Sequence, residues 1–128
     1  MIGQAGMLAL IALGGAVGAV MRFTLSSAAA ALFGRGFPYG TLLVNVLGSC
    51  VIGALYVLLT ERVVGGAGWR AFAVVGLLGA LTTFSTFSME TLLMLEAGHL
   101  GRAAANVLLN VSLCLVACWC GLVLVRQL

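Results

Sequence analysis

Four long apolar stretches, separated by short loops that contain glycine or proline, occupy almost the whole 128-residue chain. A helix needs about 20 apolar residues to cross a bilayer, so each stretch is long enough to span one. Only 7% of the residues are charged and the mean hydropathy is +1.26, whereas about 25% of the residues in a soluble domain are charged. The sequence therefore predicts an all-α integral membrane protein.

The four stretches are expected to form one transmembrane domain over residues 1–128, without a separate soluble domain. The expected spans are Met7–Phe33, Thr41–Thr60, Trp69–Leu95 and Arg102–Val125. We interpret the first as a retained span rather than a signal peptide, because it stays apolar as far as about Leu32 and no basic residue precedes it. An even number of crossings places both termini on one side of the membrane.

The basic residues, all of them arginine, are divided almost evenly between the two sides. On the side of the termini lie Arg62, Arg70 and Arg126; on the other side lie Arg35 and Arg102, with Arg22 in the last turns of the first span. Lysine and arginine in short loops determine the direction of insertion. Such a balance fits a chain that inserts both ways and forms an antiparallel homodimer. It fits equally a weakly biased chain whose first helix decides its orientation.

Small residues recur at helical spacing, as at Gly14 and Gly18, and predict close packing of helices within one subunit. Cys114 and Cys118 share a helix face but Cys118 and Cys120 do not, so the four cysteines, which include Cys50, do not converge on one point. We therefore interpret them as small apolar fillers rather than metal ligands. An enzyme is not expected, because one histidine and three glutamates supply no set of nucleophile, base and orienting group.

Polar residues form a stripe along one face of the second span. They are Thr41, Asn45, Gly48 and Ser49. A buried amide such as that of Asn45 needs acceptors for two hydrogens and a donor for its oxygen. It therefore either joins two helices by hydrogen bonds or faces a polar path. Asn106 and Asn110, four residues apart in the fourth span, have the same two interpretations.

The third span contains the polar run Gly-Ala-Leu-Thr-Thr-Phe-Ser-Thr-Phe-Ser at residues 79–88. Gly76 and Gly79, followed by the β-branched Thr82 and Thr83, weaken the helix and predict a break at mid-membrane. Broken helices in membranes expose carbonyl groups that coordinate cations and amide groups that face anions. The break therefore predicts an ion site.

Beyond the break, Phe84, Phe87, Ser88 and Thr91 fall on one helical face. The edge of a phenyl ring carries partial positive charge. Two ring edges beside hydroxyl groups and the Asn45 amide would form a site of donors without a full positive charge, which suits a small, strongly hydrated anion. The alternative is that both rings are packing residues.

Three stretches, Gly14–Arg22, Gly40–Ser49 and Gly76–Phe87, carry a family resemblance over nearly the whole chain. In this order, and with the Thr-Thr-Phe-Ser-Thr-Phe run in the last, they resemble the signature stretches of the Fluc (CrcB) fluoride channels. The resemblance implies a dual-topology antiparallel homodimer in the cell inner (plasma) membrane, with two pores through which fluoride leaves the cytoplasm passively. It also implies a structural sodium ion at the dimer centre.

The resemblance further implies a role for particular residues. Asn45 would be the pore amide, and Phe84 and Phe87 would form a box of ring edges. Hydroxyl groups along the path would belong to Thr41, Ser85 and Ser88. The backbone carbonyls of Gly79 and Thr82 would hold the sodium ion.

Three further positions complete the implied pathway. Arg22 would attract anions into a vestibule, unless it extends to the lipid head groups. Glu90 would lie near the pore mouth, where pairing with Arg22 is an alternative. The fourth span lacks the aromatic hydroxyl expected of the family, so we assign its place on the path to Ser112, with Asn110 as a competitor.

Two other classes of protein share part of this pattern. A small four-span multidrug or cation efflux transporter has the same size and charge balance, but needs a carboxylate in the first span, where this chain has none. A non-conducting membrane assembly subunit leaves the polar run unexplained. The expected partners are a second copy of the chain, fluoride and the lipid bilayer, and no nucleic acid.

Overall fold

The structure, a computed structural model, describes residues 2–128, and they form an all-helical bundle. Four helical spans are long and apolar enough to cross a membrane: Gln4–Phe33, Tyr39–Glu61, Ala67–Glu96 and Leu100–Gln127. The predicted number of spans is confirmed, and no predicted end differs from the observed end by more than three residues.

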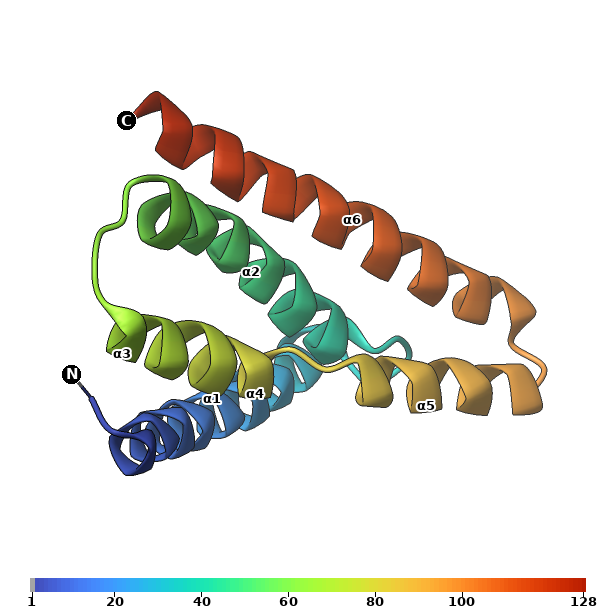
Figure 1. The fold of residues 1–128 in the computed structure, drawn as a ribbon. Coiled ribbons are helices and arrows are strands. Elements are labelled where there is room, and N and C mark those ends of the chain that lie inside the picture. The colour runs from blue at the N-terminus through green and yellow to red at the C-terminus, as the bar shows by residue number, and fades with distance from the viewer. Residues whose placement is uncertain (1) are drawn as a thin grey trace.

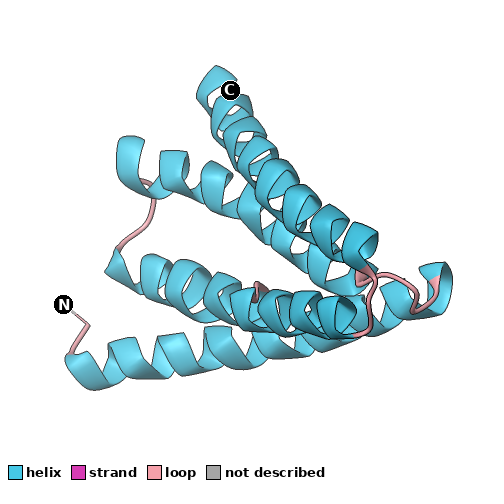
Figure 2. Ribbon diagram, turned by 90° about the vertical axis from the view of Figure 1, so that its right-hand side faces the viewer, coloured by secondary structure: helices cyan, strands magenta, loops and turns pink. Residues whose placement is uncertain are grey.

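Two of the four spans are not uniform α-helices. The elements are α1 (Gln4–Phe33), α2 (Tyr39–Tyr56), the π-helical η1 (Val57–Glu61), α3 (Ala67–Trp69), the π-helical η2 (Arg70–Leu78), α4 (Gly79–Leu81), α5 (Phe84–Glu96) and α6 (Leu100–Gln127). Short linkers join the spans (Figure 2). The N-terminal and C-terminal ends lie at the same end of the bundle, as an even number of crossings requires (Figure 1).

Glycine lets the backbones of neighbouring helices approach closely. Helix α1 packs along η2, and a Cβ atom added at Gly14 or Gly18 would collide with the carbonyl oxygen of Phe72 or Leu77, respectively. Helix α2 packs along α6 in the same way, with Gly53 against the Cys118 carbonyl. The prediction that these small residues pack helices within one subunit is confirmed.

Most of the large apolar side chains are on the outside of this bundle. The buried apolar cluster consists of Val44, Leu78 and Leu81, with a few partly buried neighbours. In contrast, Phe23, Leu108 and many others are exposed over the outer faces. A soluble monomer rarely exposes a contiguous apolar patch of more than a few hundred Å². The outer faces are therefore suited to lipid or to another apolar helix.

The third span is interrupted at two threonines. Thr82 (φ −83°, ψ 155°) and Thr83 (φ −151°, ψ 112°) are extended, between α4 and α5. The Thr83 hydroxyl accepts a hydrogen bond from the Thr86 backbone N–H (3.1 Å) and so caps the start of α5. The depth of this interruption in a bilayer stays a prediction.

Candidate functional site

Asn45, on α2, bonds to the backbone at the interruption. Its Oδ1 accepts a hydrogen bond from the Thr83 N–H (2.8 Å), and its Nδ2 donates to the Thr83 carbonyl oxygen (3.2 Å). In a continuous helix the Thr83 N–H would bond to the carbonyl of Gly79, four residues earlier. The amide of Asn45 therefore stabilises the break by supplying the acceptor that the extended backbone lacks.

The polar contacts continue from Asn45 into α6. The second hydrogen of Asn45 Nδ2 goes to Asn110 Oδ1 (3.0 Å), and Asn110 Nδ2 donates to Asn106 Oδ1 (3.0 Å). Asn106 is fully buried and donates to the Thr91 hydroxyl of α5 (2.9 Å). Asn106 and Asn110 thus join α2, α5 and α6 by hydrogen bonds, as the interpretation of these residues as links between helices expects.

A pocket of about 550 Å³ lies beside the interruption. Its lining consists of Asn45, Gly48, Ser49, Ile52, Val74, Leu78, Gly79, Thr82, Thr83, Phe84, Phe87, Asn110, Val111, Cys114 and Leu115. None of these described lining residues has a charged side chain at neutral pH. The pocket therefore offers amide, hydroxyl and backbone groups in surroundings that are otherwise apolar.

The two phenyl rings contribute differently to this pocket. The ring centroids of Phe84 and Phe87 are 5.3 Å apart, with the planes tilted by 55°. Phe87 is only 8% exposed, whereas Phe84 is 79% exposed. The predicted ring pair therefore exists as a pair, but one of its members is uncovered within this single chain.

The backbone carbonyls of Gly79 and Thr82 lie where the helix has lost two of its usual donors. In a continuous helix these oxygens would accept from the N–H groups of Thr83 and Thr86. Those two N–H groups bond instead to Asn45 Oδ1 and to Thr83 Oγ1. Gly79 and Thr82 also line the pocket. The break thus leaves oxygen groups of the kind that coordinate alkali cations at broken helices.

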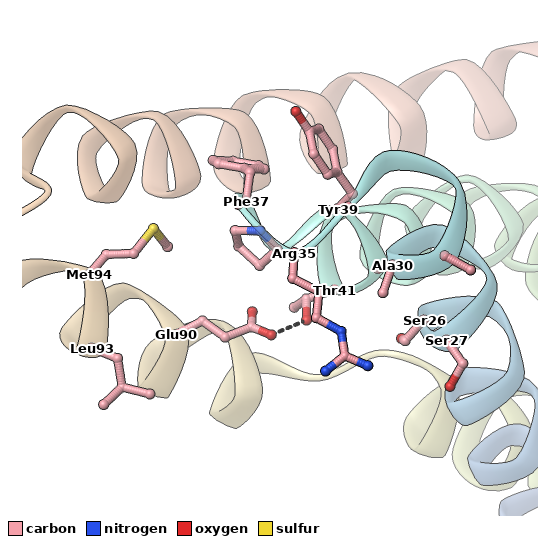
Figure 3. A pocket seen from close by; sticks show the side chains of 15 residues that line it. Ser26, Ser27, Ala30, Arg35, Phe37, Tyr39, Thr41, Glu90, Leu93 and Met94 are labelled. Carbon is pink, nitrogen blue, oxygen red and sulfur yellow. Dashed lines mark hydrogen bonds between the residues drawn. The ribbon is translucent and has the colours of Figure 1, made fainter. Parts of the chain in front are cut away.

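A second pocket, of about 560 Å³, lies on the loop side of Thr41 and includes Arg35 and Glu90 (Figure 3). The Thr41 hydroxyl donates to Glu90 Oε1 (2.8 Å), and Glu90 Oε2 is buried without a hydrogen-bond partner among the described residues. Thr41 and Asn45 are one helical turn apart on α2, so the two pockets follow each other along it.

Four of the predicted pathway residues line neither pocket. Ser85 is exposed, and the hydroxyls of Ser88 and Ser112 donate to carbonyls of their own helices, those of Phe84 (2.8 Å) and Leu108 (2.6 Å). Arg22 is partly buried and forms no ion pair with Glu90 among the described residues; the Glu90 carboxylate accepts a hydrogen bond from Thr41 instead. The roles proposed for these four residues stay predictions.

The sequence analysis did not assign Arg35 to the site, and it named Thr83 in the break and Thr91 on the polar face without their hydrogen-bond partners. Arg35 counted only toward the charge balance, yet it is the arginine that lines the pocket with Glu90. Its position between Gly34 and Gly36, next to the Phe-Pro pair, is the available sequence signal. Thr83 and Thr91 act through hydrogen bonds to the asparagines, which spacing along one helix cannot reveal.

Four apolar spans with an uncharged polar pocket between them define a small multi-pass membrane protein with an internal polar site. A family model described as CrcB-like protein, Camphor Resistance (CrcB), matches residues 9–122. The chain belongs to this family, and the resemblance noted in the sequence is confirmed.

Similar proteins of this family match almost end to end. A protein of Pseudoalteromonas translucida is 52% identical over 118 residues, which cover 92% of this chain and 98% of that protein. One of Shewanella amazonensis is 56% identical over 111 residues, covering 87% of this chain and 89% of that protein. One of Vibrio parahaemolyticus is 47% identical over 126 residues, covering 98% and 99%. All three are named fluoride-specific ion channel FluC.

Proposed function

We propose that this protein is a fluoride-selective ion channel that lets fluoride leave the cytoplasm passively across the cell inner membrane. The observation that carries the proposal is the pocket beside Thr83, where the Asn45 amide and the Phe84 and Phe87 rings meet without a charged side chain. Relatives that match nearly the whole chain are named fluoride-specific ion channels. The protein is therefore a channel and not an enzyme.

An uncharged site suits conduction because an ion must enter and also leave. A fixed positive charge would hold fluoride strongly, whereas ring edges and an amide are weaker electrostatic partners. Both hydrogens of Asn45 Nδ2 already donate to protein acceptors, the Thr83 carbonyl and Asn110 Oδ1. An anion that binds Asn45 must compete with one of them, and this competition limits its residence time.

Halide efflux from liposomes tests the proposal. Purified protein is reconstituted into liposomes loaded with potassium fluoride or potassium chloride, and efflux is started with a potassium ionophore. Fluoride should leave rapidly and chloride at the rate of protein-free liposomes, because the larger anion is less strongly attracted by the same donors. Comparable efflux rates for the two halides would contradict selectivity for fluoride over chloride. No efflux of either would favour a non-conducting assembly subunit.

We also propose that the channel is an antiparallel homodimer of subunits with opposite orientations in the membrane. The arginine count is nearly equal on the two sides. The pocket also contains a phenyl ring, that of Phe84, which is 79% exposed. A second copy that packs against this face would cover the ring and complete the pocket as an enclosed path.

Cysteine labelling tests the dual orientation. In a chain whose four native cysteines are replaced, Gly66→Cys and Gly101→Cys place single thiols in open space at opposite ends of the bundle. A membrane-impermeant maleimide should label about half of each variant from either face. Complete labelling from one face would contradict the antiparallel arrangement while leaving halide selectivity to its own test.

We further propose a structural sodium ion at the centre of the dimer, held by the carbonyls of Gly79 and Thr82 from both subunits. The support is that the usual helical donors of both carbonyls bond elsewhere. Two carbonyls from each of two chains would supply four oxygen ligands. The ion would neutralise carbonyl dipoles that meet at the axis and so stabilise the paired breaks.

A further inference from the structure

We infer that Asn106 and Thr91 are positioning residues that fix the orientation of the Asn45 amide through a one-directional chain of hydrogen bonds. The chain runs from the Thr83 N–H to the Phe87 carbonyl by way of Asn45, Asn110, Asn106 and Thr91. The inference rests on the proposed function only in taking Asn45 as a residue of the fluoride path.

The direction of the chain is set at its first bond. A backbone N–H can only donate, so the Asn45 atom that lies 2.8 Å from the Thr83 nitrogen must be its oxygen. The NH₂ group of Asn45 is then directed toward Asn110, which must present its own oxygen at 3.0 Å. The NH₂ group of Asn110 in turn faces Asn106, where it meets both the side-chain and the backbone oxygen.

The far end of the hydrogen-bond chain follows the same direction. Asn106 Oδ1 accepts from Asn110, so Asn106 Nδ2 faces the Thr91 hydroxyl and donates to it at 2.9 Å. The single hydrogen of that hydroxyl donates to the Phe87 carbonyl at 2.7 Å, and a carbonyl can only accept. Reversing Asn45 or Asn110 would oppose donor to donor or acceptor to acceptor at both of its ends. Reversing Asn106 would oppose donor to donor at Asn110 and would draw the Thr91 hydrogen away from the Phe87 carbonyl.

This arrangement controls which group of Asn45 is available to an anion. Fluoride only accepts hydrogen bonds, so a reversed Asn45 amide would direct oxygen where the NH₂ group now lies. Asn106 and Thr91 line neither pocket, and Asn106 is fully buried. They therefore act on Asn45 only through Asn110. Aligned hydrogen bonds also strengthen one another in a medium of low dielectric constant.

Thr91→Val tests the chain at the residue most distant from Asn45. Valine has the shape of threonine but cannot accept from Asn106, so fluoride efflux should fall about tenfold. Thr91→Ser retains the hydroxyl and should restore most of the rate. Thr24→Val is the matched control, because Thr24 also donates to the carbonyl four residues earlier (Val20, 2.9 Å) but is exposed and accepts no hydrogen bond from an asparagine.

Asparagine-selective ¹⁵N labelling gives a readout that does not depend on transport. The chain contains three asparagines, Asn45, Asn106 and Asn110, and all three belong to the hydrogen-bond chain. Thr91→Val should shift the side-chain NH₂ signals of all three, including the distant Asn45, whereas Thr24→Val should shift none. A shift confined to Asn106, or unchanged fluoride efflux in Thr91→Val, would overturn the inference.

A double mutant separates positioning from general stability. In an Asn106→Leu background, Thr91→Val should not reduce efflux further, because the bond between the two residues is already absent. Additive losses of fluoride efflux would contradict the proposed chain of hydrogen bonds. If the parent protein conducts no fluoride, the proposed function fails, yet the NH₂ signals still decide whether Thr91 orients Asn45.

Discussion

Two of the zones in which helices of this bundle meet differ in what lies between the helices, and we call them the glycine seam and the asparagine seam. In the glycine seam, Gly14 and Gly18 of α1 lie directly against the backbone carbonyls of Phe72 and Leu77 in η2. In the asparagine seam, the side chains of Asn45, Asn110 and Asn106 join α2, α5 and α6 through hydrogen bonds. The first seam brings backbones into contact, whereas the second bridges a gap with amides.

The glycine seam belongs to the packing that holds the bundle together, whereas the asparagine seam belongs to the candidate functional site. Where glycine lets backbones touch, the space between them is filled, and the contact is sensitive to any added atom. Where amides bridge the helices, those of Asn45 and Asn110 line a pocket of about 550 Å³ at the interruption of the third span. A glycine substitution should therefore affect assembly, whereas a substitution in the asparagine seam should affect ion passage first.

The largest effect is expected in the glycine seam. In Gly18→Leu the new side chain would collide with the Leu77 carbonyl and the Ala80 side chain. The Leu77 backbone atoms cannot move aside by side-chain rotation, so we expect a loss of stability at or above the range of about 1–3 kcal/mol for overpacked sites. Size-exclusion chromatography in detergent should show aggregate in place of a monodisperse peak.

Gly15→Ala is the matched control for that substitution. A Cβ atom at Gly15 would lie 4.0 Å from the nearest atom outside its own helix, the Gly76 carbonyl oxygen. The variant should behave like the parent, because this distance is an ordinary contact. A monodisperse and conducting Gly18→Leu variant would show that the glycine seam is not more sensitive to added atoms than the asparagine seam.

The second effect is expected at Asn45. Asn45→Asp keeps the shape and the acceptor for the Thr83 N–H, but loses both donors, to the Thr83 carbonyl and to Asn110. It also adds a charge that repels fluoride. Loss of two hydrogen bonds corresponds to at least a roughly 100-fold fall in fluoride efflux.

Liposome efflux measures this loss, and size-exclusion chromatography establishes whether assembly survives. Gln4→Glu makes the same change from amide to carboxylate at an exposed position and should leave efflux unchanged. If the Asn45→Asp variant were monodisperse and conducted fluoride like the parent, the asparagine seam would serve helix packing alone.

The fold was predictable because each of its main features is local in the sequence. Apolar length located the four spans to within three residues at every end. Two glycines and two β-branched threonines predicted an interruption, and Thr82 and Thr83 are extended. The spacing of Gly14 and Gly18 predicted close packing of helices. Each inference needed only one helix at a time.

The partners at the site were not predictable, because they depend on how separate helices meet. Spacing placed Phe84 and Phe87 on one face, but α5 begins at Phe84, so that ring is exposed while Phe87 is buried. Asn45 was recognisable as a buried amide, yet its bonds to Thr83 and Asn110 join residues 38 and 65 positions apart. Hydropathy carries no information on such pairs.

A smaller effect is expected when the rings are changed one at a time. Phe84→Leu removes a ring edge from a side chain that is 79% exposed, so stability should change by less than about 0.5 kcal/mol. Phe87→Leu affects a buried ring and should cost up to about 1.5 kcal/mol. If ring edges contact the anion, both should reduce fluoride efflux, by up to about tenfold.

Phe23→Leu provides the control for the exposed ring. Phe23 is 75% exposed, close to the value for Phe84, but it lies on α1 and lines neither pocket. Its replacement should not change efflux. If the loss of efflux followed stability, and was thus seen for Phe87→Leu but not for Phe84→Leu, the rings would act as packing residues and not as anion contacts.

The smallest effect is expected at the proposed sodium site, where the ligands are backbone atoms. Thr82→Val removes a hydroxyl that donates to the Leu78 carbonyl (2.9 Å) but leaves the Thr82 carbonyl in place. The rise in melting temperature on replacing potassium by sodium should therefore equal that of the parent, because a ligand stabilises only through its own affinity.

Thr83→Ala should reduce this rise. It removes the acceptor of the Thr86 N–H, and that N–H is then free to bond to the Thr82 carbonyl in competition with sodium. Equal sodium-dependent shifts in Thr83→Ala and the parent would show that the break does not depend on the Thr83 cap. Loss of the sodium-dependent rise in melting temperature in Thr82→Val would indicate that side chains, and not backbone carbonyls, hold the cation.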